Sequence, residues 1–303
     1  MIVEFRGVEK SYGYVKALRG ATFEVPRGVL AGLLGPNGSG KTTSLKLSIG
    51  LLKRDKGDIK VFGLDPWVSG AEVRSRVGVL HERPLYPLDV RVRKLLSHLA
   101  RLRRYGDEEA YRVARLVGLK DYLNASVGSL SRGYLQRLGI AQSLIGEPEL
   151  LLLDEPTANL DPSARMGVLK LIATLKRDLG VTVVVSSHII PELQEICDYA
   201  IFISEGVVAA YGYLSDLARL FETTSIYVVE TPKPRELAST LIREGCVVGV
   251  EVGDGSLKVK VPGGELETFE GLISSMEREG LVLSYKHVSS SLGDLYVKAV
   301  KSF

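Results

Sequence analysis

Residues Leu130–Asp161 read LSRGYLQRLGIAQSLIGEPELLLLDEPTANLD, and the order of residues here is the strongest indication of the fold. A Leu-Ser-x-Gly turn opens a helical pattern, and the apolar run Leu150–Leu153 follows it and ends in Asp154 and Glu155. A continuous apolar run of strand length is typical of a parallel strand that is buried on both faces. The stretch therefore predicts a turn, a helix and a buried strand, with two acids at the end of the strand and so at the edge of a parallel sheet.

The turn itself has the chemistry of an anion site. Ser131 is a good N-cap for a helix that starts near Gly133, because its hydroxyl can accept a hydrogen bond from a free backbone N–H. A hydroxyl together with free N–H groups at a helix start suits a phosphate. A simple helix cap without a ligand is the alternative, and the turn alone does not decide between them.

A glycine loop upstream supplies a second phosphate site. Residues 35–43 read GPNGSGKTT, which fits G-x-x-x-x-G-K-[ST] between an apolar run at 29–34 and a helical pattern at 42–52. In such a loop the backbone N–H groups turn toward the phosphates, Lys41 meets the β- and γ-phosphates, and the Thr42 hydroxyl can ligate Mg²⁺. The predicted nucleotide-binding residues of this loop are Gly35, Pro36, Asn37, Gly38, Ser39, Gly40, Lys41, Thr42 and Thr43.

The two acids after the apolar strand complete the chemistry of this site. Asp154 is placed to hold Mg²⁺, and Glu155, the next residue, can polarise an attacking water. An acidic pair at a solvated strand end is the alternative for these residues taken alone. The glycine loop before them favours the catalytic interpretation, with Lys41 and Glu155 as catalytic residues and Asp154 and Thr42 as metal ligands.

Composition limits what else the chain can be. It has 303 residues, 45% of them hydrophobic and 25% charged, which is typical of a soluble protein with two domains. The net charge of +3 is too balanced to argue for nucleic acid as a partner. Cys197 and Cys246 have no metal-binding spacing, which favours a reduced, cytoplasmic compartment. No apolar run approaches the roughly 18–20 residues that span a bilayer, so work at a membrane requires a partner.

The pattern of elements predicts two domains with a boundary near residue 222. Over residues 1–222, buried strands alternate with helices, which predicts an α/β fold with a mostly parallel sheet, a β-rich start at 1–30 and a helical region at 89–135. A further helix is expected at 191–197. Over residues 223–303, the order strand, helix, strand, strand, helix, strand predicts a small α+β domain of the ferredoxin-like kind. This second domain carries no catalytic constellation and is expected to pair subunits or regulate them.

Taken together, the motifs of residues 1 to about 220 resemble the nucleotide-binding subunit of ABC transporters, within the P-loop NTPase fold. Residues 130–134 occupy the place of the signature motif, whose fuller form is LSGGQ, so Arg132 and Tyr134 depart from it. Residues 156–161 resemble the D-loop, with Asp161 at its acidic position. The resemblance implies that Ser131 and Gly133 bind ATP held by a second chain, and that ATP closes the pair of chains and hydrolysis reopens it.

Three further residues receive roles from the same resemblance. His188, after the apolar strand at 181–186, matches the histidine that contacts the γ-phosphate and positions the catalytic glutamate and water. Tyr12 matches the aromatic that stacks on adenine, with a turn aromatic packed on the sheet as the alternative. Glu82 stands where the family has the Q-loop glutamine and could ligate Mg²⁺, with a solvated loop charge as the alternative. His81, His98 and His287 form no cluster and are interpreted as structural.

The resemblance also implies partners and a location. Residues 91–104, RVRKLLSHLARLRR, form a basic helix with an apolar stripe of Leu95, Leu99 and Leu102. In the family this region receives the membrane subunit, and an exposed solvated face is the alternative. Glu82 and the tail Ser291-Leu-Gly-Asp-Leu-Tyr-Val-Lys resemble ABC-2-type exporter ATPases. The expected partners are an integral membrane permease and a second cassette, identical or paralogous, with ATP and Mg²⁺ bound between the cassettes and the protein held peripherally at the inner face of the cell membrane.

Three other kinds of protein compete with this interpretation. A non-transport ABC ATPase, such as a translation factor, usually carries two cassettes, whereas this chain has one glycine loop. A chromosome-maintenance ATPase would need a long coiled coil between Thr43 and Leu130. A sensor that only binds ATP would be expected to lack Glu155 or Ser131, and both are present.

Overall fold

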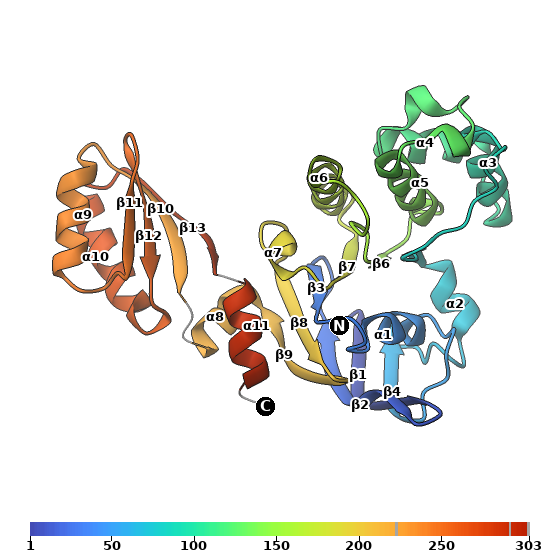
Figure 1. Ribbon diagram of the computed structural model, residues 1–303, viewed down its shortest axis with the longest axis horizontal. Coiled ribbons are helices and arrows are strands. Elements are labelled where there is room, and N and C mark those ends of the chain that lie inside the picture. The colour runs from blue at the N-terminus through green and yellow to red at the C-terminus, as the bar shows by residue number, and fades with distance from the viewer. Residues whose placement is uncertain (222–223, 291, 302–303) are drawn as a thin grey trace. The chain divides into compact units, whose positions relative to one another are not determined.

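The computed structural model describes residues 1–221, 224–290 and 292–301, and it divides into two compact units (Figure 1). The first unit is Met1–Ile189 with Ile196–Tyr211, and the second is Ile190–Glu195 with the chain from Gly212 onward. The predicted boundary near residue 222 lies within the second unit and stays a prediction. No helix in the described ranges is long and apolar enough to cross a membrane.

A six-stranded sheet forms the centre of the first unit, in the order β5-β6-β7-β3-β8-β9. The pairs β5–β6, β6–β7, β3–β7 and β3–β8 are parallel, and every residue of β3, β6 and β7 is buried. The predicted α/β fold is therefore confirmed, and the apolar runs are the strands buried on both faces. The strands are β3 (Leu30–Leu34), β5 (Val77–Leu80), β6 (Leu150–Asp154), β7 (Thr182–Ser187), β8 (Tyr199–Ser204) and β9 (Val207–Tyr213).

A three-stranded antiparallel sheet accounts for the β-rich start of the chain. It has the order β2-β1-β4, with β1 (Val3–Tyr12), β2 (Val15–Val25) and β4 (Lys56–Val61). The rings of Phe5 and Phe23 stack 4.4 Å apart in its core. The sequence predicted β1 and β2 but not β4, whose first three residues are exposed and give a weak apolar pattern.

The helices of the first unit begin and end where local chemistry predicts. For α6 (Pro162–Leu179), the side chain of Asp161 accepts a hydrogen bond from Ala164 N at 3.0 Å, Pro162 opens the helix, and Gly180 ends it with φ 65°. The others are α1 (Lys41–Ser48), α2 (Gly70–Ser75), α3 (Val92–Leu102), α4 (Asp107–Leu116) and α5 (Arg132–Leu144), with short 3₁₀ turns η1 (Lys120–Tyr122) and η2 (Val127–Ser129).

Helices α3, α4 and α5 pack together as the helical region that the sequence predicted (Figure 1). The buried face of α3 includes Leu95, Leu96 and Ala100, whereas Leu102, which belongs to the predicted apolar stripe, is 69% exposed. The basic side chains of Arg93, Lys94 and Arg101 are exposed, so α3 presents positive charge to its surroundings. Leu102 therefore belongs to the exposed surface of α3 and not to its packing face.

The second unit contains a four-stranded antiparallel sheet in the order β11-β12-β10-β13. Its core includes Val229, Leu257, Val259, Phe269 and Ile273, and the β-α-β-β-α-β order matches the prediction. The elements are α7 (Ile190–Leu193), α8 (Leu214–Leu220), β10 (Ser225–Glu230), α9 (Pro234–Arg243), β11 (Gly249–Val252), β12 (Ser256–Val261), η3 (Gly263–Glu265), α10 (Leu266–Arg278), β13 (Ser284–Ser290) and α11 (Leu292–Lys301). Of the predicted exporter-type tail, Ser291 lies outside the described residues and the rest begins α11.

One sequence prediction needs correction, and one helix was missed. The helix expected at 191–197 is only α7, Ile190–Leu193. The chain leaves the helix early because Asp198 N donates to Leu30 O at 3.0 Å and Cys197 is buried, so these residues already lead into β8. Helix α11 was not predicted, since its pattern was interpreted only as a family ending.

An ion-pair cluster at the start of β6 predicts a pH dependence of stability. Glu149 accepts hydrogen bonds from Arg76 and Arg27, which lower the pKa of its carboxyl to about 2 from its ordinary 4.5. The stabilisation is therefore present above pH about 4.5 and is lost as the pH falls toward 2. Because the Glu149 side chain is 41% exposed, we expect about 1 kcal/mol and not the full value of the shift.

The measurement compares Glu149→Gln with the unmodified protein. Chemical denaturation at pH 6 should give the variant a free energy of unfolding lower by about 1 kcal/mol, and the difference should shrink by pH 3. A difference that grows on acidification would contradict the prediction.

Candidate active site

The glycine loop between β3 and α1 is folded around the side chain of Lys41. Its Nζ donates to Gly35 O at 2.8 Å and to Pro36 O at 3.1 Å, and Lys41 is only 6% exposed. Gly40 has φ 107°, and a Cβ there would lie 2.6 Å from Ala17 O, so only glycine fits. The loop therefore holds one buried ammonium at its mouth, where a phosphate chain would lie.

The electrostatics of Lys41 depend on nearby acids. Burial lowers the pKa of the Lys41 ammonium, and the carboxylates of Glu155, Asp154 and Glu82 oppose that shift. Its Nζ lies 3.5 Å from Oε1 of Glu155. A ligand with negative charge would compensate the buried ammonium of Lys41, and a metal ion bound with it would compensate the nearby carboxylates.

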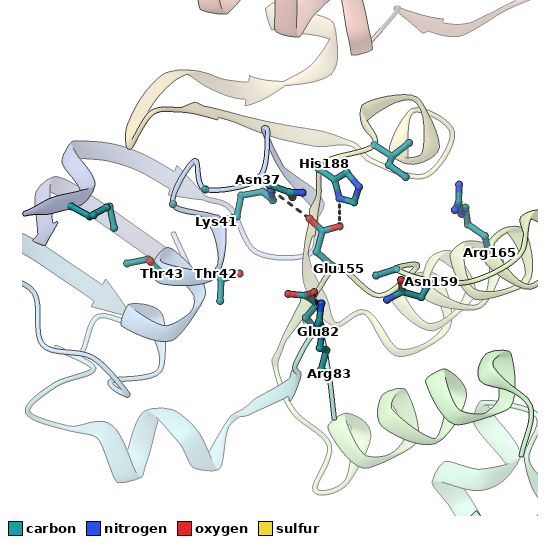
Figure 2. A pocket seen from close by; sticks show the side chains of 16 residues that line it. Asn37, Lys41, Thr42, Thr43, Glu82, Arg83, Glu155, Asn159, Arg165 and His188 are labelled. Carbon is teal, nitrogen blue, oxygen red and sulfur yellow. Dashed lines mark hydrogen bonds and ion pairs between the residues drawn. The ribbon is translucent and has the colours of Figure 1, made fainter. Parts of the chain in front are cut away.

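Glu155 connects three elements of the site (Figure 2). Its Oε2 lies 2.8 Å from Nδ1 of His188, on the chain that follows β7, while its Oε1 faces Lys41. Its backbone has φ 48°, the left-handed region, directly after β6. That conformation costs a non-glycine residue about 1–2 kcal/mol, and it turns the carboxylate out of the strand direction. Glu155 is thus held between a cation and an imidazole, as a general base would be.

Asp154, the residue before Glu155, fits the edge of a magnesium site. Thr42 Oγ1 donates to Asp154 Oδ1 at 3.2 Å, so a hydroxyl and a carboxylate oxygen meet at the end of β6. Mg²⁺ takes oxygen ligands and commonly uses one or two carboxylates plus phosphates and waters. Within the described ranges, no group of three or more His, Cys, Asp or Glu side chains could hold a metal by itself. The oxygens of Thr42 and Asp154 therefore fit an ion that arrives with a nucleotide.

A cavity of about 740 Å³ joins these groups. Nine of the predicted site residues line it: Asn37, Gly38, Gly40, Lys41, Thr42, Thr43, Glu82, Glu155 and His188. Seven more line it without having been predicted: Val15, Ala17, Arg83, Ala158, Asn159, Arg165 and Ile189. Ala158 and Asn159 belong to the PTANLD stretch and could have been predicted from it, whereas Arg165, in the first turns of α6, belongs to no motif.

Glu82 faces this cavity from the chain that follows β5 (Figure 2). Its side chain is 43% exposed, and its Oε1 lies 3.4 Å from Nε of Arg83. The carboxylate of Glu82 is close enough to Lys41 to raise the pKa of that ammonium, so it adds negative potential beside the predicted phosphate position. A glutamine here would add no such charge.

Eight predicted residues do not line the cavity. Gly35, Pro36, Ser39 and Asp154 belong to the glycine loop and the end of β6 beside it, and the other four lie elsewhere in the chain. Tyr12 ends β1 with 47% of its surface exposed, and Asp161 caps α6. Ser131 caps α5 by accepting from Tyr134 N at 3.4 Å, and Gly133 follows in the first turn. The hydroxyl and N–H groups at the start of α5 therefore do not belong to the lining of this chain's own cavity.

The two departures from the signature motif have partners of their own. The ring of Tyr134 packs on Tyr122 with centroids 4.2 Å apart. Arg132 Nη1 donates to Asn159 O at 3.5 Å, which joins the signature turn to the stretch after β6. Both side chains therefore stabilise the turn within this chain.

The fold and this site define a P-loop nucleoside-triphosphate hydrolase. A loop lysine, an acid pair at a strand end and a histidine meet at the carboxyl edge of a parallel sheet, where phosphate sites of such sheets lie.

Comparison with known proteins identifies the family. The family model described as "ABC transporter" matches residues 18–158. The chain is 32% identical over 300 residues to an uncharacterised ABC transporter ATP-binding protein, YdbJ of Bacillus subtilis, covering 98% of this chain and 95% of the relative. It is 38% identical over 218 residues to the Nod factor export ATP-binding protein I of Burkholderia orbicola, covering 69% and 70%.

A solved structure, described as the ATP-binding subunit of an ABC transporter, matches with a TM-score of 0.64 and 28% identity over 73% of this chain and 93% of that one. The chain belongs to the family of ABC transporter ATP-binding proteins, and its activity is ATP hydrolysis.

Proposed function

We propose that this chain is the ATPase subunit of an ABC exporter of the ABC-2 type and that it works as a pair of cassettes. The division of the site supports the pairing. Lys41, Glu155 and His188 surround one cavity, whereas Ser131 and Gly133 do not line it. A second chain placed head to tail would bring its signature turn to this cavity and complete the site around ATP.

The charged and polar residues in and beside the cavity have separate tasks in hydrolysis. Lys41 neutralises the β- and γ-phosphates, Glu155 orients and deprotonates the attacking water, and His188 holds the Glu155 carboxylate in place. Asp154 and Thr42, with Glu82 beside them, would hold Mg²⁺, which neutralises charge that develops on the phosphates. The γ-phosphate is the contact that distinguishes the closed pair from the open one, since ADP lacks it.

The pairing predicts a separation of binding from turnover at Ser131. We expect Ser131→Ala to lower ATP turnover about 10–100-fold, the effect of losing a hydrogen bond to a charged group, because the lost hydroxyl served the partner's γ-phosphate. ATP affinity of the isolated chain should stay within about threefold. Steady-state turnover and fluorescent-nucleotide titration measure the two quantities.

Ser75→Ala is the matched control, because the Ser75 hydroxyl donates to Glu72 O in its own helix, α2. It should leave both quantities unchanged. If Ser131→Ala weakens ATP binding by the isolated chain as strongly as it slows turnover, Ser131 serves the site of its own chain and the pairing proposal fails.

Export and a membrane partner are supported by three features. Glu82 replaces the Q-loop glutamine, α3 exposes Arg93, Lys94 and Arg101, and a relative at 38% identity is named for Nod factor export. We therefore propose an integral membrane permease as the partner, with this chain peripheral at the inner face of the membrane. Affinity purification from detergent-solubilised membranes should recover a protein with several hydrophobic spans.

The alternative is a non-transport ABC ATPase that acts on a ribosomal or other macromolecular partner. Sedimentation of the tagged chain with ribosomes, together with failure to recover any membrane subunit, would replace the exporter proposal by this one. Nucleic acid as a direct partner is not expected, since the net charge is only +3.

A further inference from the structure

Ser186, the fifth residue of β7, is fully buried next to the two acids. In the parallel register of β6 and β7 it lies opposite Asp154. Its hydroxyl makes two hydrogen bonds: Oγ donates to Asp154 Oδ1 at 2.6 Å and accepts from Glu155 N at 2.9 Å. One buried oxygen therefore joins the carboxylate of one acid to the backbone of the next.

The direction of these bonds follows from donor and acceptor chemistry. A backbone N–H can only donate, so the bond from Glu155 N uses a lone pair of the hydroxyl. The single hydroxyl proton is then free for the Asp154 carboxylate, which accepts it. With the bonds in these directions, the Glu155 amide, the Ser186 hydroxyl and the Asp154 carboxylate all have a hydrogen-bond partner.

The bond to Glu155 supports a conformation that the chain would otherwise avoid. With φ 48°, Glu155 stands in the left-handed region, and its amide needs an acceptor because it is buried at the end of β6. Ser186 supplies that acceptor. The turn that aims the Glu155 carboxylate at Lys41 and His188 is therefore held from β7.

The neighbouring serine, Ser187, does not share the contacts of Ser186 with the two acids. The Ser187 hydroxyl is also buried, but it accepts from Ile189 N at 3.0 Å and so belongs to the turn that leads through His188. The end of β7 thus acts on Glu155 twice, through Ser186 on its backbone and through His188 on its carboxylate.

We propose that Ser186 is a positioning residue of the ATPase. Its hydroxyl sets the placement of Asp154, on the metal side, relative to Glu155, the general base. This rests on the roles proposed for those two acids and is independent of the exporter proposal and of the membrane partner.

The test starts from Ser186→Ala. We expect kcat for ATP hydrolysis to fall about 10–100-fold, the cost of a buried hydrogen bond to a charged group. KM for ATP should change less than about threefold, because Ser186 does not line the nucleotide cavity. The Mg²⁺ concentration for half-maximal turnover should rise, since Asp154 loses the hydroxyl that orients it. Ser186→Thr, which keeps the hydroxyl, should recover most of kcat.

A double-mutant cycle separates positioning from simple loss of stability. In the Glu155→Gln background, measured by single turnover at saturating Mg²⁺, Ser186→Ala should slow hydrolysis less than about threefold, because the base that it positions is already gone and the metal site is filled. A purely structural defect would lower activity by the same factor in both backgrounds. Thr182→Val is the matched control, because it removes a buried hydroxyl that accepts from Gly28 N at the opposite end of β7, and it should leave kcat unchanged.

Three results would overturn the proposal, and they point to two different causes. If the Glu155→Gln variant is slow, then a normal kcat for Ser186→Ala, or an equal loss in both backgrounds, removes only the positioning role of Ser186. Normal turnover by Glu155→Gln removes the role of Glu155 and this proposal with it.

Discussion

Glu155→Gln should reduce ATP turnover by about 10²–10⁴-fold, the usual contribution of a general base. The amide has nearly the shape of the carboxylate but cannot accept the proton of the attacking water. The carboxylate lies 2.8 Å from Nδ1 of His188 and 3.5 Å from Nζ of Lys41, so it is already held in the position from which a water would be oriented. ATP binding should survive, since the phosphate loop is unchanged, and a paired, ATP-bound form should accumulate.

The measurement combines steady-state turnover, ATP titration and molar mass by light scattering with and without ATP. The matched control is Glu205→Gln: Glu205 has nearly the same backbone conformation, φ 49°, but is exposed in the turn between β8 and β9. It should turn over ATP normally. Unchanged turnover by Glu155→Gln would remove the residue from catalysis, and loss of ATP binding would mean that its main task is to support Lys41.

The central sheet could be predicted from the sequence because strands that are buried on both faces have continuous apolar sequences. Strands β3, β6 and β7 are covered on both faces, so each reads as an unbroken run of apolar or small residues. The edge strand β9 and strand β4 were not predicted, because they are only partly buried and their apolar residues have no clear period. Helix α7 was predicted too long, since a window of sequence does not show that Cys197 and Asp198 are already committed to β8.

The residues of the candidate site also form two groups, those that could be predicted from the sequence and those that could not. Residues that occupy fixed places in a motif, such as Lys41 and Glu155, could be predicted because the spacing carries the chemistry. Ser186 and Arg165 could not, because their contribution depends on which strands and helices become neighbours in the fold. The sequence alone does not show that the Ser186 hydroxyl in β7 accepts a hydrogen bond from the amide of Glu155.

Gly35→Ala should weaken ATP binding by about 10³-fold. A Cβ at Gly35 would lie 2.0 Å from the backbone oxygen of Ile203 and 2.8 Å from Ser39 Oγ, far inside van der Waals contact. Ile203 belongs to β8, which pairs with β3, so its carbonyl cannot retreat without breaking the sheet. The loop must move instead, and Lys41 loses the acceptor Gly35 O. Losing two charge-assisted hydrogen bonds to phosphate, at about 1.5–3 kcal/mol each, gives roughly this factor.

Gly28→Ala is the matched control because it changes a glycine at the opposite end of the same strand. Gly28 has φ 74° and nothing within 4 Å of its added Cβ, so the substitution should lower the free energy of unfolding by about 1–2 kcal/mol through backbone strain alone. ATP titration should then give an unchanged affinity for Gly28→Ala and a greatly reduced one for Gly35→Ala, with both proteins folded by circular dichroism. The shortest contact at Gly35 is with backbone, which cannot move aside as a side chain can. Normal ATP affinity in Gly35→Ala would therefore mean that the loop tolerates displacement and that its backbone N–H groups contribute little to phosphate binding.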